Sequence, residues 1–313
     1  MTASGPGRFA SVARIPRFRS NELAGSRFRV WAGVFAVLAT GLLVLGACQG
    51  GDLIGEAGSA GSLSVPIEMV VIGDFGDGGQ SEYAVANVVR DTVGARDISV
   101  FLTTGDNFYS DDVEAVWDRP YGWLDEEGVT VLAVWGNHDI ETDTRLGLVQ
   151  ETLDPPGRWY SADLGSGSLI VLDSNLVDDS SQTEWLKTEL EESGPPSIVV
   201  FHHPAFSCGF HGTDQEVQAN WVPLFEQHAV TVVLNGHDHN YERFVIDDTT
   251  YVVTGGGGRR LRPTGACPTG TPEPVARDDE MHHFIVMEIS ATSLSGEVIA
   301  ADGTKIDTFD IDY

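Results

Sequence analysis

Five short apolar segments of this chain are each followed by residues that bind metals or carry protons, and this pattern constrains the fold most. One segment is Ile98–Leu102, a β-branched run that predicts a buried strand. It leads into Gly105-Asp106-Asn107-Phe108-Tyr109. Open α/β sheets carry their sites at the carboxyl ends of strands, so Asp106 and Tyr109 are expected there. Taken alone, Gly-Asp after a strand is most often a turn.

Four other predicted strands are also followed by residues that can bind metals or carry protons. Their terminal motifs are Gly73-Asp74-Phe75-Gly76, Gly136-Asn137-His138-Asp139, His202-His203 and Gly236-His237-Asp238-His239. A buried carboxylate needs a partner, and these motifs lack a neighbouring Lys or Arg. The alternation of an extended segment places His237 and His239 on one side of the chain. Together the motifs indicate a pair of divalent or trivalent cations.

The order of predicted elements indicates an α/β domain with two sheets. Helices are expected over residues 81–93, 113–126, 181–192 and 214–228, and a hairpin over 158–163 and 168–173. Ser181 and Glu184 form a capping box that predicts the start of the third helix. After residue 250 the pattern changes to short strands and Gly-rich turns, which predicts an antiparallel tail.

The charge of the chain excludes several classes of partner. Lys and Arg number 18 against 47 Asp and Glu, which gives a formal net charge of −29. A surface that binds nucleic acid or an anionic membrane requires the opposite sign. A solvated surface suited to high salt is favoured over an acidic binding face.

The N-terminus has a different composition from the rest of the chain. Residues 1–29 are Arg-rich, the apolar run Val30–Leu45 follows, and Leu45-Gly46-Ala47-Cys48 ends it. This pattern predicts a bacterial export signal over residues 1–47. The end resembles a lipobox, which implies a lipid on Cys48 and attachment to the outer face of the bacterial cell membrane. The alternative is an uncleaved anchor, although the run is short for a spanning helix.

The exported chain is then expected to have two parts. Residues 48–64 are rich in Gly, Ala and Ser and predict a flexible tether, and residues 65–313 form the domain. Cys208 and Cys267 are left after lipidation of Cys48. In an oxidising compartment they are expected to form a disulfide that braces the loop carrying His211; two free thiols are the alternative.

The five motifs, in their order along residues 67–254, resemble those of the calcineurin-like metallophosphoesterases. Within this group the chain looks like a purple acid phosphatase of the small, single-domain type. The resemblance implies a two-sheet α/β/β/α sandwich with a dinuclear metal site at the carboxyl ends of its strands. It also implies an acid phosphatase that hydrolyses small phosphate monoesters with a metal-bound hydroxide.

The resemblance also implies a role for each motif residue. The ligands of one ion, Fe(III), are Asp74, Tyr109, His239 and the bridging Asp106. The ligands of a divalent Fe, Zn or Mn are Asn137, His202, His237 and the same Asp106. Phenolate and carboxylates suit the harder ferric ion, whereas imidazoles suit the softer divalent one. The two ions would lie about 3.5–4 Å apart.

Two further histidines are expected to act on the substrate. His138 is not a ligand in this scheme, and His211 lies nine residues after His202, the spacing of the second substrate histidine in the small members. They are expected to bind phosphate and to protonate the leaving group. For His203 a catalytic role and a packing role stay open. Arg259 and Arg260 either contact a second anionic group of a substrate or lie on the surface.

Two other functions remain as alternatives. The first is a phosphodiesterase or nucleotide hydrolase of the same superfamily; these commonly have Asp-x-His in the first motif, where this chain has Asp74-Phe75-Gly76, and lack a counterpart of Tyr109. The second is a metal-loaded surface protein that binds phosphate or a partner without catalysis. That function predicts a missing ligand or proton donor, and none is missing from the motifs.

Overall fold

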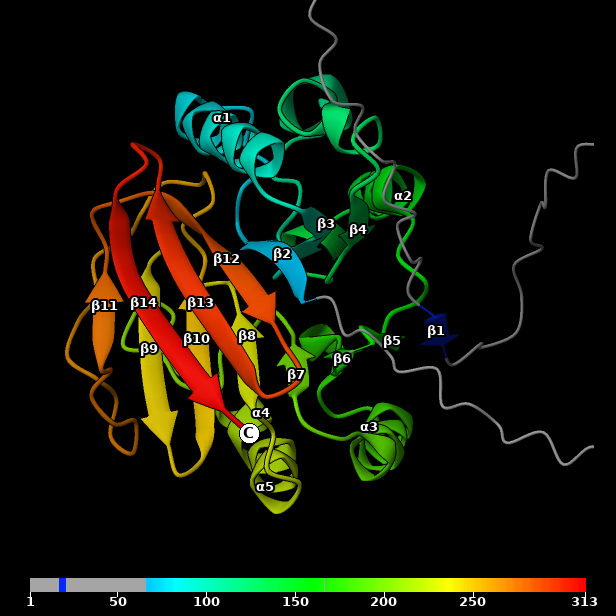
Figure 1. Ribbon diagram of the computed structural model, residues 1–313, viewed down its shortest axis with the longest axis vertical. Helices are drawn as coiled ribbons and strands as arrows, with labels where there is room; N and C mark the ends of the chain where they lie inside the picture. Colours follow the sequence, from blue (N-terminus) through cyan, green and yellow to red (C-terminus); the bar gives the residue numbers. More distant parts are fainter. Residues whose placement is uncertain (1–16, 21–65, 166) are drawn as a thin grey trace, which may run out of the picture. The chain divides into compact units, whose positions relative to one another are not determined.

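The computed structural model describes residues 17–20, 66–165 and 167–313, and it contains two β-sheets (Figure 1). The eight-stranded sheet has the spatial order β1 (Arg17–Ser20), β5 (Tyr160–Asp163), β6 (Ser168–Val171), β7 (Ser197–Val200), β8 (Val232–Asn235), β10 (Thr249–Thr254), β9 (Tyr241–Ile246) and β11 (Ala276–Asp278). The six-stranded sheet has the order β14 (Lys305–Asp312), β13 (Ser293–Ala300), β12 (His283–Ile289), β2 (Ile67–Ile72), β3 (Ile98–Thr103) and β4 (Thr130–Leu132).

The two sheets pack face to face, and helices cover their outer faces. The helices are α1 (Gln80–Ala95), α2 (Asp143–Leu153), α3 (Ser180–Glu192), α4 (Gln215–Asn220) and α5 (Val222–Gln227). In Figure 1, α1 and α2 lie beside β2 to β4, and α3 to α5 lie beside β6 to β8. The predicted α/β/β/α sandwich is therefore confirmed.

Alternation along the central strands explains the layers. In β2, Met69 and Val71 belong to the core between the sheets, whereas Val70 and Ile72 belong to the core under α1. In β7, Ile198 faces the central core and Val199 faces the core under α3 and α5. Both faces of these strands are apolar because both are covered.

The strands that precede the motifs run parallel to their neighbours. β2 pairs with β3 and β3 with β4 in one sheet, and β7 pairs with β8 in the other. Their carboxyl ends therefore meet at one edge of the sandwich, where the connecting loops carry the motif residues.

Several predicted helices differ from the observed ones. The expected helix over 113–126 is a π-helical turn at Glu114–Asp118 and a 3₁₀ turn at Gly122–Leu124, since Pro120 between them interrupts helical hydrogen bonding. The helix expected over 214–228 is divided into α4 and α5, with Pro223 in the first turn of α5. Further 3₁₀ turns span His138–Ile140 and Ser174–Leu176.

The predicted capping box is wrong, because the N-cap of α3 lies two residues earlier, at Asp179. The Asp179 carboxylate caps this helix and accepts a hydrogen bond from the Ser181 backbone N–H over 2.8 Å. Ser181 thus lies inside the helix rather than at its N-cap.

The predicted export signal and tether lie almost wholly outside the described residues, and so does Cys48. The exception is β1, which pairs antiparallel with β5 and falls inside the segment expected to be removed. No helix in the described part of the chain has the length and apolarity needed to cross a membrane.

Candidate metal centre

The loops after β2, β3 and β8 hold three of the expected ligand residues in an unusual backbone conformation. Asp74, Asp106 and His237 have positive φ angles of 56°, 50° and 70°. Such angles are uncommon for residues other than glycine and cluster at functional sites. The strain at these three residues is sustained by the close packing of the loops around them.

A glycine precedes four of the seven expected ligands, and at these positions the loops approach one another closely. A Cβ atom at Gly236 would lie 2.5 Å from Asp74 Oδ2, and one at Gly136 would lie 2.2 Å from Asp106 Oδ1. No side chain fits at either position. The Gly-Asp, Gly-Asn and Gly-His pairs of the sequence are therefore packing requirements of the site.

Tyr109 lies at the centre of one half of the site. Its Oη is 3.0 Å from Asp74 Oδ1, 3.0 Å from Asp106 Oδ2 and 3.2 Å from His239 Nε2. All four residues that were expected to bind Fe(III) are thereby brought together.

The second half of the site gathers around His202. Its Nε2 lies 3.1 Å from Asn137 Oδ1, 3.2 Å from His237 Nδ1 and 3.3 Å from Asp106 Oδ2. Asp106 therefore contacts both halves, as a bridging ligand requires. Asp74, Asp106 and His202 also form one of the groups whose ligand atoms are close enough to hold a single ion.

Backbone carbonyls fix the orientation of two imidazoles. His202 Nδ1 lies 2.9 Å from the Thr104 carbonyl oxygen, and His239 Nδ1 lies 2.9 Å from that of Arg260. A carbonyl accepts the ring hydrogen, so Nδ1 carries a hydrogen and Nε2 faces the site in each residue. This arrangement is typical of metal-binding histidines.

Asp139 ties the loop after β3 to the loop after β4. Its carboxylate accepts hydrogen bonds from the backbone N–H groups of Asn107 at 2.8 Å, Phe108 at 3.1 Å and Gly136 at 2.8 Å. The Asn107 side chain donates to it as well, over 2.7 Å. Asp139 thereby holds Asp106 and Asn137 in register from behind.

The electrostatics of the site fit cation binding. Asp74 and Asp106 are 0% and 1% exposed, and among residues 66–165 and 167–313 no Lys or Arg side chain pairs with them. Burial raises the pKa of Asp74 well above its usual value. Burial acts the same way on Asp106, but the His202 imidazolium overcomes it and lowers the pKa of Asp106. Without a cation, bound protons thus offset the negative charge of the buried carboxylates. A bound cation would neutralise the same charge.

Two ligand imidazoles are neutral in this setting. Burial lowers the pKa of His239 to about 4, and it lowers the pKa of His237 further. A neutral imidazole has a free lone pair, which metal coordination requires.

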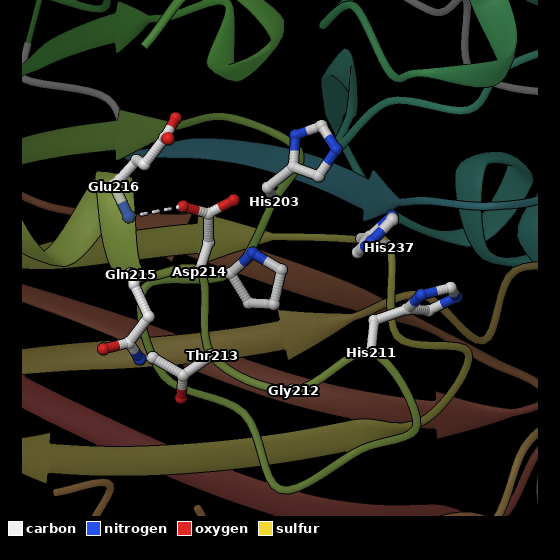
Figure 2. A pocket seen from close by; sticks show the side chains of 9 residues that line it. His203, His211, Gly212, Thr213, Asp214, Gln215, Glu216 and His237 are labelled. Carbon is white, nitrogen blue, oxygen red and sulfur yellow. Dashed lines mark hydrogen bonds between the residues drawn. The ribbon is translucent and has the colours of Figure 1, made fainter. Parts of the chain in front are cut away.

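His211 and His237 lie next to each other on one side of a pocket of about 270 Å³ (Figure 2). Their ring centroids are 4.1 Å apart. The pocket is lined by His203, Pro204, residues 211–216 and His237. His138 lies elsewhere, on the Tyr109 half, with its ring 4.6 Å from that of Tyr109 and its Nδ1 3.0 Å from Glu141 Oε2. The two expected substrate histidines therefore border different halves of the site.

His203, whose role the sequence leaves open, also faces this pocket. Its backbone N–H donates to Ser174 Oγ over 3.0 Å, and its Nδ1 lies 2.8 Å from the same oxygen. When the Ser174 hydroxyl donates to Nδ1, the ring hydrogen of neutral His203 is on Nε2. In that tautomer His203 presents a hydrogen-bond donor to the site.

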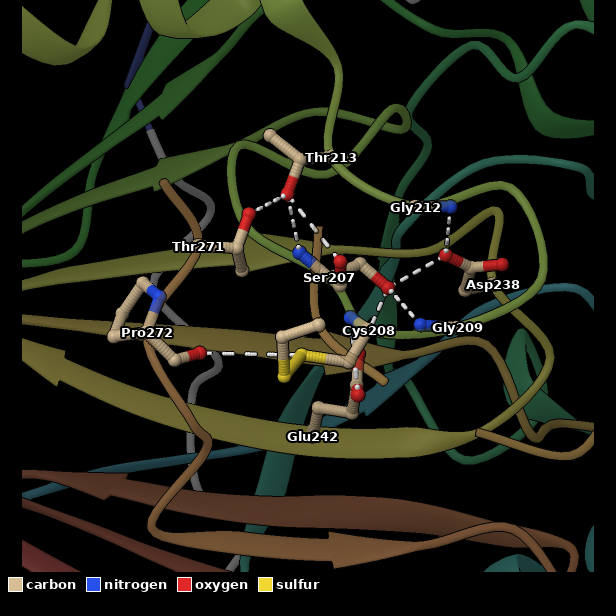
Figure 3. Close-up of a disulfide and its surroundings, with 10 residues drawn as sticks. Ser207, Cys208, Gly209, Gly212, Thr213, Asp238, Glu242, Thr271 and Pro272 are labelled. Atoms are coloured by element: carbon tan, nitrogen blue, oxygen red, sulfur yellow. Dashed lines mark hydrogen bonds between the residues drawn. A yellow bond between two sulfur atoms is a disulfide. The ribbon is translucent and has the colours of Figure 1, made fainter. Parts of the chain in front are cut away.

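Asp238 shapes the loop that carries His211 (Figure 3). Its Oδ1 accepts from the His211 backbone N–H over 2.7 Å, and its Oδ2 accepts from Gly212 N–H over 3.0 Å and from Ser207 Oγ over 2.6 Å. The predicted disulfide between Cys208 and Cys267 is confirmed in the same loop.

The fold and this arrangement of carboxylates and imidazoles define a class of protein: residues 67–241 match the family model of the calcineurin-like phosphoesterases, and the chain belongs to that family. Within the family it is a purple acid phosphatase-like metallophosphoesterase, and members of that group use a dinuclear metal centre.

Individual relatives with low sequence identity to this chain include acid phosphatases of the same group. Purple acid phosphatase 21 of Arabidopsis thaliana is 29% identical over 62% of this chain and 51% of its own length. The chain thus spans about half of that relative. Tartrate-resistant acid phosphatase type 5 of Sus scrofa is 22% identical over 87% of this chain and 93% of its own length. The structure of purple acid phosphatase PPD1 from yellow lupin has a TM-score of 0.66 at 20% identity, covers 80% of this chain and 54% of its own, and shows a shared fold.

Proposed function

We propose that this protein is an acid phosphatase that hydrolyses small phosphate monoesters. The observation that carries the proposal is the position of the Tyr109 phenol between the two buried carboxylates of Asp74 and Asp106, 3.0 Å from each. A phenol at this point is a ligand suited to a hard trivalent ion. The neighbouring imidazoles provide a softer site.

The donor set fits two cations. Asp74, Tyr109, His239 and Asp106 would hold Fe(III), and Asn137, His202, His237 and Asp106 would hold a divalent Fe, Zn or Mn. When bound, these ions would neutralise the phosphoryl oxygens and lower the pKa of a water molecule.

The chain's own side chains would bind the ester and move its protons. The Nε2–H of His203 and the ring of His211 border the pocket and are placed to donate hydrogen bonds to phosphate oxygens. His211 is exposed at the edge of the pocket, and we assign it the proton that the leaving oxygen takes up. His138 is 38% exposed, borders the Tyr109 half, and is assigned the opposite edge of the phosphate.

A substrate panel tests the proposal. The purified protein is assayed with alkyl and aryl phosphate monoesters and with bis(p-nitrophenyl) phosphate as the diester. The proposal expects kcat/KM for monoesters to exceed that for the diester by at least an order of magnitude. Preference for the diester would indicate the phosphodiesterase function instead. A metal-replete protein that hydrolyses none of these esters would indicate a binding function.

The cellular location belongs to the same proposal. An export signal over residues 1–47 and a lipid on Cys48 would place the domain on the outer face of the cell membrane, where a disulfide is stable. Mass spectrometry of the native protein tests this, with a lipid-modified Cys48 at the N-terminus as the expected result. An unmodified Cys48 with residues 30–45 retained would refute it.

A further inference from the structure

An arginine–phenylalanine rim borders the candidate metal centre, and we define it as Phe210, Arg259 and Arg262. The Arg262 guanidinium carbon lies 4.3 Å from the centroid of the Phe210 ring. That ring is 66% exposed and lies 5.1 Å from the ring of His211. On the other half of the site, the Arg259 guanidinium carbon lies 4.6 Å from the centroid of Tyr109. The rim thus approaches the centre from two sides.

The backbone of the rim is bonded to the ligand loops themselves. The Arg259 N–H donates to the Asp74 carbonyl oxygen over 2.8 Å, and the Arg262 N–H donates to that of His239 over 3.1 Å. The positions of both arginines are therefore set by residues that we assign to metal binding.

A covalent link fixes the two segments that make the Phe210–Arg262 contact. The disulfide between Cys208 and Cys267 joins them (Figure 3). The Gly265 N–H also donates to the Cys208 carbonyl oxygen over 2.7 Å. Ordering these loops costs nothing further when a ligand binds, so the rim is preorganised.

Within the described residues, no carboxylate pairs with Arg262, and Arg259 has only a long ion pair. Other arginines of this acidic chain pair with carboxylates, as Arg96, Arg158 and Arg243 do. The partner of Arg259 is Asp77, at 3.7 Å. Unpaired positive charge next to the centre attracts an anion.

We infer that Arg262, held in place by Phe210 and assisted by Arg259, binds a second anionic group of the substrate. The preferred substrates would be phosphate compounds whose leaving group carries another phosphate. A guanidinium suits this task because its planar fork of N–H donors matches phosphate oxygens. The inference rests on the proposed function, which places the scissile phosphate between His138 and His211.

A binding experiment tests the rim without turnover. Isothermal titration compares methylenediphosphonate with methylphosphonate on the metal-loaded protein as isolated. Arg262→Ala is expected to weaken binding of the diphosphonate by about tenfold or more, since hydrogen bonds to charged groups contribute on this scale, and to leave methylphosphonate unchanged. Lys187→Ala on α3 removes the same charge at an exposed position and serves as the control. An unchanged preference in Arg262→Ala would overturn the inference.

Kinetics separate the rim from the chemistry. In the hydrolysis of ADP, water adds to the terminal phosphorus, the P–O bond to AMP breaks, and AMP leaves with the bonding electrons. AMP is the comparison substrate, because its leaving group is neutral adenosine. Arg262→Ala and Phe210→Ala are both expected to lower kcat/KM for ADP and to spare AMP. An equal loss on AMP in Phe210→Ala would show that the ring binds the base, which contradicts its positioning role. The two proposals can fail separately. If no ester is hydrolysed but the preference for the diphosphonate still depends on Arg262, the proposed phosphatase function is refuted and the inference about the rim is supported.

Discussion

The Tyr109 side chain points back toward Asp106, three positions earlier in the chain, and its Oη lies 3.0 Å from Asp106 Oδ2. The Tyr109 backbone N–H joins this loop to the loop after β2, because it donates to the Gly76 carbonyl oxygen over 2.7 Å. One short loop thereby supplies both the ligand that contacts each half of the site and the phenol between the carboxylates.

This relationship predicts a visible colour that depends on Tyr109. Without a cation, burial raises the pKa of Tyr109 well above its usual value, and Asp74 and Asp106 raise it further. A phenolate is therefore expected only on a bound Fe(III), where it gives a charge-transfer band. Tyr109→Phe should abolish the band while the far-UV circular dichroism stays unchanged. A wild-type protein that is active, colourless and free of iron would contradict this.

The division of ligands predicts the metal content. We expect two ions per chain, at least one of them iron, by elemental analysis of active protein. Asp106→Asn should reduce the content of both ions, because Asp106 contacts both halves, whereas His237→Ala should remove mainly the divalent one. One ion or fewer per active chain would refute the dinuclear arrangement.

The position of His211 predicts a dependence on the leaving group. His211→Ala should lower turnover by about 10²–10⁴-fold for alkyl phosphates, which need a proton, and much less for p-nitrophenyl phosphate. Its metal content should stay at the wild-type value. His202→Ala, in contrast, should lose the divalent ion and depress all substrates alike. Equal losses on both substrate types in His211→Ala would leave His138 as the acid.

Glu82 predicts how stability depends on pH. This residue is 0% exposed, its Oε2 accepts from the Gly78 N–H over 2.6 Å, and burial raises its pKa to about 9. The folded protein therefore retains a proton that the unfolded chain releases near pH 4.5. Between those values, rising pH lowers the free energy of unfolding by up to about 1.4 kcal/mol per pH unit from this group.

Glu82→Gln should remove that contribution. Urea unfolding at several values from pH 5.5 to 8 is expected to show the variant gaining on the wild type as pH rises. Glu184→Gln, a matched change at an exposed site on α3, should give no such trend. Parallel stability curves for Glu82→Gln and the wild type would rule out a buried, protonated Glu82.

The disulfide predicts a stability difference that reductant abolishes. It joins residues 59 positions apart, and closing a loop of that length stabilises a fold by about 2–4 kcal/mol. Cys208→Ser combined with Cys267→Ser should lower the unfolding free energy by this amount, and dithiothreitol should lower the wild type to the same level. Equal stability of the oxidised wild type and the double variant would contradict the prediction.

The strands and the site could be predicted because each carries its own local signal. Apolar, β-branched runs such as Ser197–Val200 form buried strands, and the glycines before the ligands mark loops that pack too closely for a side chain. The sequence missed α2, since Gly147 lies at its middle and only Val149 and Leu153 are buried. A helix with so few buried positions shows little amphipathic periodicity.

Contacts between distant segments could not be predicted in this way. Phe210 and Arg262 are joined only through tertiary structure, and nothing in either local sequence indicates the other. The position of Arg259 over Tyr109 depends likewise on the loop after β10 crossing the loop after β2. The same limit applies to β9, whose Glu242 and Arg243 obscure its strand pattern because their partners come from elsewhere.

The ligand residues are shared between the two sheets: Asp74, Asp106 and Asn137 follow strands of the six-stranded sheet, and His202 and His237 follow strands of the eight-stranded one. Neither sheet alone holds a complete set. A chain cut in the loop over residues 154–159, between α2 and β5, would give two fragments that each lack part of both expected ligand sets and so cannot retain both ions as the intact chain would. Reassembly of such fragments would regenerate the purple centre, so the site would serve as a built-in optical reporter of the docking of one half of the molecule on the other.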